Sequence, residues 1–188
     1  MGELRIGVRV IGTVRGDITG VRADALVNAA NSALAGGGGV DGAIHRAGGR
    51  AIMADLERRY GRDRYCPTGG AVLSVAGDLP AQWVVHAVGP VWHGGGAGEP
   101  ELLASAYRTA FQVANEAGAR TIAAAAISTG IFGYPLDEAA TIAVGTAAEH
   151  LAGPTNVQRI DFVLFSGDAL DVFDRVLGRV CGEAADPT

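Results

Sequence analysis

Lysine is missing from this chain, in which all 15 basic residues are arginine. Its absence excludes a lysine Schiff base, a lysine nucleophile and the phosphate-binding lysine of Walker-type nucleotide sites. Cysteine is scarce as well: Cys66 and Cys181 lie far apart, and neither belongs to a CxxC pair or to a Cys/His cluster with zinc spacing. We therefore expect two free thiols in a reducing compartment, without a disulfide bridge and without a metal site.

Long hydrophobic runs are absent too. No apolar stretch reaches the length that spans a bilayer, and the opening pattern LRIGVRVIGTV lacks the charged head, apolar core and cleavage site of a signal peptide. The net charge of -5 leaves no dense basic footprint of the kind that proteins coating nucleic acid need. We expect a cytoplasmic protein that acts as a monomer and binds neither a membrane nor nucleic acid.

With 188 residues, of which 48% are hydrophobic, the chain can bury the core of one globular domain. Strand-like and helix-like patterns alternate along it, which predicts an α/β fold with a mixed sheet between helical layers. We expect one domain over residues 1–181 and a disordered tail at 182–188. Strands are predicted at Leu4–Val14, Ala25–Asn28, Ala71–Val75, Trp83–Val88, Thr121–Ile127 and Ile160–Phe165. The last four are short and apolar, as buried central strands are. Helices are predicted at Val40–Ala47, Arg50–Tyr60, Pro100–Ala117, Leu136–Leu151 and Leu170–Val180.

Glycine-rich loops follow three of the predicted strands, at Ala35–Gly42, Gly89–Gly98 and Ser128–Pro135. In α/β folds, ligands bind where loops leave the carboxyl ends of the strands. Glycine lets backbone amides approach an anion such as phosphate, and a helix that begins at the loop favours the same charge. For the middle loop, with its GGGAG run at Gly94–Gly98, a flexible connection between a strand and a helix is the favoured explanation.

Slack does not explain the first loop, because Asn28, Asn31, Asp41 and His45 crowd around its four consecutive glycines. The loop contains a GxGxxG pattern at Gly37–Gly42, which matches the dinucleotide-binding fingerprint. In a Rossmann unit, however, the glycines follow the strand immediately, whereas here several residues intervene. An NAD-dependent oxidoreductase is therefore a remote alternative. His86 lies in an apolar strand and is interpreted as a core histidine with satisfied hydrogen bonds.

Four segments of the chain resemble the macrodomain family: GDIT (Gly16–Thr19), NAANSALAGGGGVDGAIH (Asn28–His45), CPTG with VVHAVGPVW (Cys66–Gly69 and Val84–Trp92), and ISTGIFGYP (Ile127–Pro135). The likeness is to the MacroD-type branch of ADP-ribosyl hydrolases, and it spans nearly the whole chain. The segments are long, ordered and separated by family-like distances, which makes the match highly specific. It implies an α/β fold of three layers, αβα, with a mixed sheet of roughly six strands and a deep cleft for ADP-ribose.

The resemblance implies a place for each loop along ADP-ribose. Asp17 would accept a hydrogen bond from the adenine amine beside the Ile18 backbone, although Asp before a chain reversal also commonly caps the turn. Phe165 would pack on adenine, with a core phenylalanine as the alternative, and Phe132 would pack against the distal ribose or anchor its loop. The amides that would hold the diphosphate belong to Ser128, Thr129, Gly130, Ile131, Phe132, Gly133 and Tyr134.

The first loop would be the reaction site. Asn31 would bind the distal ribose hydroxyls. A second segment would wrap the ribose and phosphates so closely that a Cβ at its glycines would clash with the ligand. That segment comprises Gly37, Gly38, Gly39 and Val40.

The catalytic group that the resemblance implies is Asn31, Asp41 and His45. Asp41 would orient or deprotonate a water near the anomeric carbon, helped by the substrate's own phosphate, and the nearby diphosphate would raise its pKa. Asp41 could also cap the helix that follows. His45, one turn further on, would support the loop rather than act as the general base.

The implied function is a hydrolase that releases ADP-ribose from mono-ADP-ribosylated acidic side chains and also deacylates O-acetyl-ADP-ribose. Its partners would be ADP-ribose, O-acetyl-ADP-ribose and mono-ADP-ribosylated proteins, and it would need no cofactor. The absence of lysine counts against the lysine-dependent mechanism of a related branch. A reader that binds ADP-ribose without turnover is the main alternative. Such readers can lack Asn31, Asp41 or both, so the presence of both favours the hydrolase.

Overall fold

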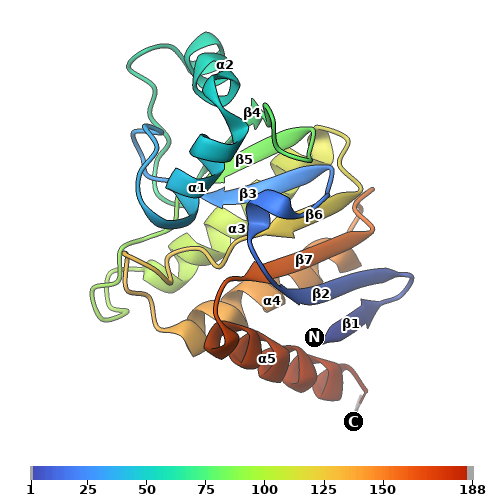
Figure 1. The fold of residues 1–188 in the computed structure, drawn as a ribbon. Helices are drawn as coiled ribbons and strands as arrows, with labels where there is room; N and C mark the ends of the chain where they lie inside the picture. The colour runs from blue at the N-terminus through green and yellow to red at the C-terminus, as the bar shows by residue number, and fades with distance from the viewer. Residues whose placement is uncertain (1, 186–188) are drawn as a thin grey trace.

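A computed structural model describes residues 2–185 of the chain (Figure 1). In this part, one sheet contains the strands β1 (Glu3–Ile6), β2 (Arg9–Arg15), β3 (Ala25–Ala29), β4 (Ala71–Val75), β5 (Trp83–Ala87), β6 (Thr121–Ala124) and β7 (Arg159–Leu164). The helices are the short 3-10 helix η1 (Ile18–Gly20), α1 (Gly39–Gly48), α2 (Arg50–Tyr60), α3 (Glu99–Glu116), α4 (Leu136–Ala152) and α5 (Gly167–Ala185). Within the described residues, no helix has the length and hydrophobicity that a membrane span requires.

Helices cover both faces of the sheet, so the molecule has the three αβα layers that the sequence predicts (Figure 1). On one face, α3, α4 and α5 pack against the strands around Phe111, Phe162 and Phe173. On the other face, a second core built around Ile52 and Leu26 joins α1, α2 and η1 to the sheet. Two separate hydrophobic cores on opposite faces are what an α/β sandwich requires.

The sheet order is β1-β2-β7-β6-β3-β5-β4. Neighbouring strands from β2 to β5 pair in parallel, while β1 and β4 are antiparallel to their neighbours at the two edges. The sheet is therefore mixed, as predicted. The parallel strands all end at one edge of the sheet, so the loops that follow them meet there.

Two expectations for the strands are wrong. The predicted single strand Leu4–Val14 is a hairpin, in which Ile6 pairs with Arg9. The chain reverses at Gly7, whose φ of +63° suits glycine, and Val8 at the turn is 93% exposed. The hairpin raises the number of strands among the described residues to seven. The predicted central strand Ala71–Val75 is instead the edge strand β4, and most of its side chains are only half-buried.

The carboxyl-terminal end of the chain also differs from expectation. Helix α5 continues to Ala185, so residues 182–185 of the predicted tail are helical. The alanines at 184 and 185 favour continuation of a helix. Residues 186–188 lie outside the described part. Cys66 is a buried free thiol, as predicted, and burial raises its pKa; the Cys181 side chain is not among those described.

Candidate functional site

Two adjoining cavities lie at the edge of the sheet where the parallel strands end. The smaller has a volume of about 190 Å³, and the larger about 640 Å³. They share a wall, formed by Gly39, Val40, Ala126 and Gly130, and together make one cleft. Their combined size is in the range of small-molecule sites, roughly 300 to 1,000 Å³.

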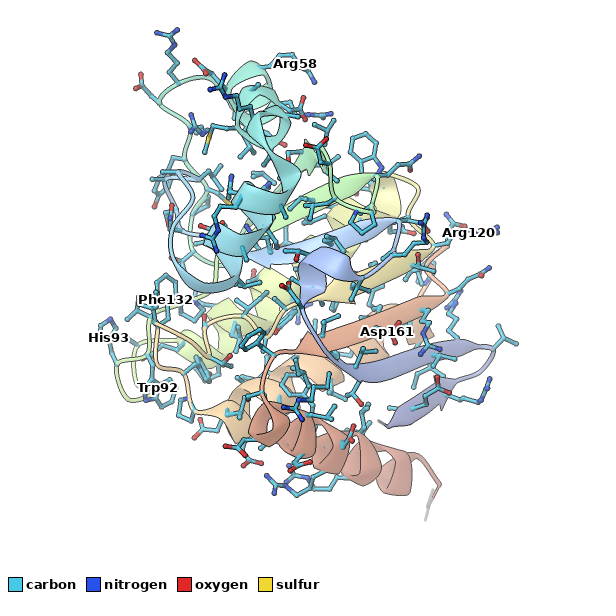
Figure 2. All side chains as sticks on the ribbon, in the orientation of Figure 1. Arg58, Trp92, His93, Arg120, Phe132 and Asp161 are labelled. Atoms are coloured by element: carbon cyan, nitrogen blue, oxygen red, sulfur yellow. The ribbon has the colours of Figure 1, made fainter. Side chains whose placement is uncertain are left out.

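The smaller cavity lies between the loop after β3 and the loop after β6. It brings together most of the residues predicted for the distal ribose, the diphosphate and the reaction, namely Asn31, Gly37, Gly38, Gly39, Val40, Asp41, Ser128, Gly130, Ile131 and Phe132. Figure 2 shows Phe132 on the same side of the molecule as Trp92 and His93, and the Trp92 amide donates to the Phe132 carbonyl oxygen at 2.9 Å. Two loops distant in sequence therefore form one wall of the cleft.

The larger cavity contains the residues predicted for adenine. Asp17, Ile18 and Phe165 line it, together with Thr129, whose amide was predicted for the diphosphate. Phe165 is 84% exposed, so the alternative of a core phenylalanine is wrong. Asp17 does cap its turn, because its Oδ1 accepts hydrogen bonds from the Thr19 amide at 2.9 Å and the Thr19 hydroxyl at 2.7 Å. These bonds lower the pKa of Asp17, which therefore presents a carboxylate to the cavity while it caps the turn.

The loop after β6 offers fewer free amides than the sequence suggested. The Tyr134 amide donates to the Ser128 carbonyl, and the Gly133 amide donates to the Gly130 carbonyl, both at 3.0 Å. These two amides hold the loop and cannot bind a diphosphate. Tyr134 is instead buried with its ring 4.6 Å from that of Trp92. The amides of residues 129–132 have no hydrogen-bond partner among the described residues, which leaves them available to an anion.

Helix α1 begins inside the glycine run. Its N-cap is Gly38, and Asp41 lies in the first turn, so the alternative of Asp41 as the capping residue is wrong. A carboxylate in the first turn is nevertheless stabilised by the helix dipole. Gly39 has φ of +57° and open space where a Cβ would project, whereas a Cβ on Gly42 would lie 2.3 Å from the Gly37 carbonyl oxygen. Glycine is thus required at 39 by conformation and at 42 by close packing.

Asn31 and His45 both contact the glycine-rich loop that precedes Asp41. Asn31 Nδ2 donates to the Gly36 carbonyl at 2.9 Å, so Asn31 shapes the loop as well as lining the cavity. His45 does not line the cavity. Its Nε2 lies 3.4 Å from Asp41 Oδ1, and its ring would be 3.5 Å from a Cβ on Gly36. This placement agrees with a supporting position for His45 beneath the loop.

The carboxylate of Asp41 is buried and held by a polar network that the sequence did not reveal. Asn28 Nδ2 lies 2.7 Å from Asp41 Oδ1 and 3.1 Å from Nδ1 of His86. On the other side of the ring, His86 Nε2 lies 2.8 Å from the Ser74 hydroxyl. Asn28, Ser74 and His86 are fully buried. His86 is therefore the satisfied core histidine that was predicted, and it is also linked to Asp41 through Asn28.

These contacts determine the ionisation of the site. Burial raises the pKa of Asp41, but hydrogen bonds from His45 and Asn28, together with the electrostatic effect of His45, outweigh burial and lower it. Within the protein, the pKa shift is thus opposite in direction to the one expected beside a bound diphosphate. Burial and the charge of His45 lower the pKa of His86 to about 3. At neutral pH the site therefore contains an ionised Asp41 next to a neutral His86.

Asp41, His45 and His86 also form a cluster of the kind that can bind a metal, because one ligand atom from each lies within 4.8 Å of the others. The amide nitrogen of Asn28 bridges two of these atoms, since it contacts both Asp41 and His86. An N–H donor that faces a carboxylate and an imidazole nitrogen occupies the lone pairs that a cation would need. The donor set therefore suits a hydrogen-bond network better than a metal.

The sequence analysis missed several lining residues, among them Arg46 and Gly89. Arg46 lines the larger cavity on the face of α1 that also presents Gly39 and Ala43. Its spacing of three residues from Ala43 would have predicted this shared face. Gly89 lines the smaller cavity, and a Cβ there would lie 2.2 Å from the Ser128 hydroxyl oxygen. That contact joins segments distant in sequence, so no local pattern indicates it.

Comparison with known proteins gives a consistent result. A family model described as Macro domain matches residues 27–143. An O-acetyl-ADP-ribose deacetylase of Klebsiella pneumoniae (strain 342) is 48% identical over 164 residues, which cover 87% of this chain and 94% of that protein. The structure of the Oceanobacillus iheyensis macrodomain with ADP superposes with a TM-score of 0.90 at 34% identity and covers 96% of both chains. The Trypanosoma brucei macrodomain in complex with ADP-ribose superposes with a TM-score of 0.79 at 37% identity, over 89% of this chain and 69% of that one.

Proposed function

The chain belongs to the macro domain family, and on that premise we propose that it is an ADP-ribose-binding hydrolase. We propose that it deacylates O-acetyl-ADP-ribose and removes mono-ADP-ribose from modified acidic side chains of proteins. One observation carries the proposal: a buried, ionised carboxylate, Asp41, lines the smaller end of a cleft that has an exposed aromatic ring, Phe165, at its larger end.

The proposed binding mode follows the two cavities. Adenine lies in the larger one, between Phe165 and the carboxylate of Asp17, which accepts a hydrogen bond from the exocyclic amine. The diphosphate lies on the amides of residues 129–132, which no other described group uses. The distal ribose then occupies the smaller cavity between Asn31 and Phe132. This support comes from the lining residues and from relatives whose structures contain ADP or ADP-ribose.

We propose that Asp41 orients a water molecule and that the substrate's own phosphate assists proton removal. A carboxylate whose pKa lies below its ordinary value is a weak base but a good hydrogen-bond acceptor, which suits orientation more than deprotonation. On a modified acidic side chain, the water oxygen bonds to the anomeric carbon of the distal ribose, the bond from that carbon to the side-chain oxygen breaks, and the carboxylate leaves with the electron pair. On O-acetyl-ADP-ribose, the water oxygen bonds to the acetyl carbonyl carbon, the bond from that carbon to the ribose oxygen breaks, and the ribose oxygen leaves with the electron pair and takes up a proton as acetate forms. In both reactions the attacking water gives up one proton, which the substrate phosphate accepts. Asn31 and His45 assist by holding the loop that carries Asp41.

The experiment uses a protein that bears ester-linked mono-ADP-ribose, and O-acetyl-ADP-ribose in parallel, with release of ADP-ribose as the readout. We expect Asp41→Asn to abolish release while its ADP-ribose affinity, measured by calorimetry, stays close to that of the wild type. The matched control is Asp63→Asn, which removes an exposed carboxylate in the loop after α2 and should release ADP-ribose normally.

The possible results distinguish a hydrolase from a reader. Release that depends on Asp41 supports the hydrolase. Tight binding of ADP-ribose by the wild type without any release from either substrate supports a reader, and failure to bind ADP-ribose contradicts both. Release from O-acetyl-ADP-ribose alone limits the proposal to the small ester. A monomeric state and a cytoplasmic location remain predictions, for light scattering and for cell fractionation to test.

A further inference from the structure

We propose that His86 is a positioning residue, which holds the Asn28 side-chain amide so that the amide donates a hydrogen bond to Asp41. The inference rests on the proposed function, in which Asp41 orients the attacking water. His86 belongs to β5, the strand next to β3, and the parallel register places it directly opposite Asn28. It reaches Asp41 only through Asn28, since Asn28 Nδ2 contacts both Asp41 Oδ1 and His86 Nδ1.

The hydrogen bonds of the network determine which nitrogen of His86 carries the proton. The Ser74 hydroxyl can donate to the Val75 carbonyl oxygen at 3.0 Å, and its oxygen then accepts a hydrogen bond from His86 Nε2 at 2.8 Å. Nε2 is therefore protonated and Nδ1 is not. The bare Nδ1 accepts from the Asn28 amide, whose second N–H donates to Asp41. Every polar hydrogen in this series of hydrogen bonds from Ser74 to Asp41 has an acceptor.

The opposite tautomer would disrupt the site. A proton on Nδ1 would face the N–H group of Asn28, and the carboxamide would have to rotate to present its carbonyl oxygen instead. That oxygen would then lie against the Asp41 carboxylate, at the place where the amide now lies 2.7 Å away. Two acceptors in contact at a fully buried position repel each other, with little water to screen them. The tautomer of His86 thus decides whether Asp41 is held or repelled.

The orientation of Asn28 supports this reading. Its Oδ1 is buried and has no hydrogen-bond partner among the described residues, while its nitrogen contacts two. If the amide rotated, the oxygen would take the place of the nitrogen between Asp41 and His86. The observed orientation therefore keeps both hydrogen bonds that the nitrogen donates and leaves the oxygen without a partner among the described residues. The charged and titratable groups that act on His86 are Asp41 and His45, and burial keeps its ring neutral between them.

Three variants of β5 test the proposal. His86→Leu removes the acceptor for Asn28, and His86→Asn keeps a side-chain oxygen near the position of Nδ1. Val84→Ala is the structural control, because Val84 is a buried side chain on the same face of the same strand but outside the network. We expect His86→Leu to lower kcat on O-acetyl-ADP-ribose by about 10- to 100-fold, the range found when a group that orients a metal ligand is removed. The Kd for ADP-ribose should stay within about threefold in all three variants, since none of these side chains lines the cleft.

The pattern of kcat decides the outcome. The proposal predicts that His86→Asn and Val84→Ala keep kcat within about threefold of the wild type, at a temperature where every variant is folded. Equal losses in His86→Leu and His86→Asn would show that the acceptor atom is irrelevant. An equal loss in Val84→Ala would show a general effect of core packing, and full activity of His86→Leu would show that Asp41 needs no such support. Each of these three results overturns the proposal.

A second measurement does not depend on turnover. Nitrogen NMR of the histidine ring should show a bare Nδ1 and a protonated Nε2 in the wild type, and the Asn28 amide signal should follow the titration of Asp41. In His86→Leu that response should disappear. A wild type that shows this tautomer but no turnover would contradict the proposed hydrolase and leave the network intact. A proton on Nδ1 would overturn the network, whatever the activity.

Discussion

Replacement of Phe165 by alanine should weaken ADP-ribose binding without weakening the fold. The ring follows directly after β7, which ends at Leu164, and it is 84% exposed, whereas Phe162 inside that strand is completely buried. An exposed side chain outside the core contributes little to folding, so we expect the free energy of unfolding to change by at most about 0.5 kcal/mol. Loss of an aromatic ring that stacks on a base costs about 1 to 3 kcal/mol of binding, which is about 5- to 150-fold in Kd.

The assays are calorimetric titration with ADP-ribose and chemical denaturation, on Phe165→Ala and on two controls. Phe165→Tyr keeps the ring and should bind within about threefold of the wild type. Phe162→Ala should lose about 3 to 5 kcal/mol of stability because it empties a packed core position. The reasoning fails if Phe165→Ala binds as tightly as the wild type, or if it is destabilised as much as Phe162→Ala.

Four further predictions concern stability. Burial raises the pKa of Asp55, but hydrogen bonds from the Val75 amide and from two arginines of α2 outweigh it and lower the pKa from its ordinary value of 3.8. Asp55 therefore contributes to the free energy of unfolding above pH 3.8, and this contribution is lost as pH falls through the lowered pKa. In denaturation experiments, Asp55→Asn should lose less stability in acid than the wild type does. The pKa of His86 is about 3 in the folded protein and 6.5 in its ordinary state, so as pH falls the unfolded chain binds a proton at this residue before the folded protein does. The free energy of unfolding should therefore fall as pH drops from 6.5 toward 3, by about 1.4 kcal/mol per pH unit at most, and a flat difference between wild type and His86→Asn would contradict this. Gly77→Ala should destabilise the protein strongly, because a Cβ there would lie 1.9 Å from the Gly48 carbonyl oxygen and φ is +62°. Gly145 lies in α4 and has open space where a Cβ would project. Gly145→Ala should therefore raise the free energy of unfolding by about 0.5 to 1 kcal/mol, and with it the melting temperature.

Local sequence patterns located most of the secondary structure. The predicted bounds of α2 and β4 agree with the observed ones, because turn residues flank both segments and their periodicity is clear. The same reasoning missed the hairpin of β1 and β2. A single glycine at position 7 interrupts an otherwise regular strand pattern, and a reversal at one glycine cannot be told from a continuous strand by alternation alone.

The loops of the candidate site were also recognisable from the sequence. Asn31, the segment Gly37–Asp41, Ser128 and the segment Gly130–Phe132 line one cavity, as the resemblance to macrodomains implied. Their residues are close in the chain, so a short motif records both their identity and their spacing. The free amides proved fewer than expected, because Gly133 and Tyr134 use theirs to close the loop. Which amides a loop consumes internally depends on its turns and not on its composition.

Glycine content, hydrophobic period and motif spacing were enough to assign the α/β class, most helices and the candidate ligand-binding loops, and the resemblance to macrodomains singled out Asp41. These properties act over a few residues, within reach of local backbone and side-chain preferences. The exposure of Phe165, the edge position of β4 and the link from Ser74 through His86 and Asn28 to Asp41 arose only when distant segments packed. Strand pairing brings Asn28 opposite His86 across a separation of 58 residues. The hydrogen bonds that follow keep Asp41 ionised, and burial keeps His86 neutral. Neither strand register nor desolvation can be read from a short stretch of chain, because both depend on which neighbours the fold supplies.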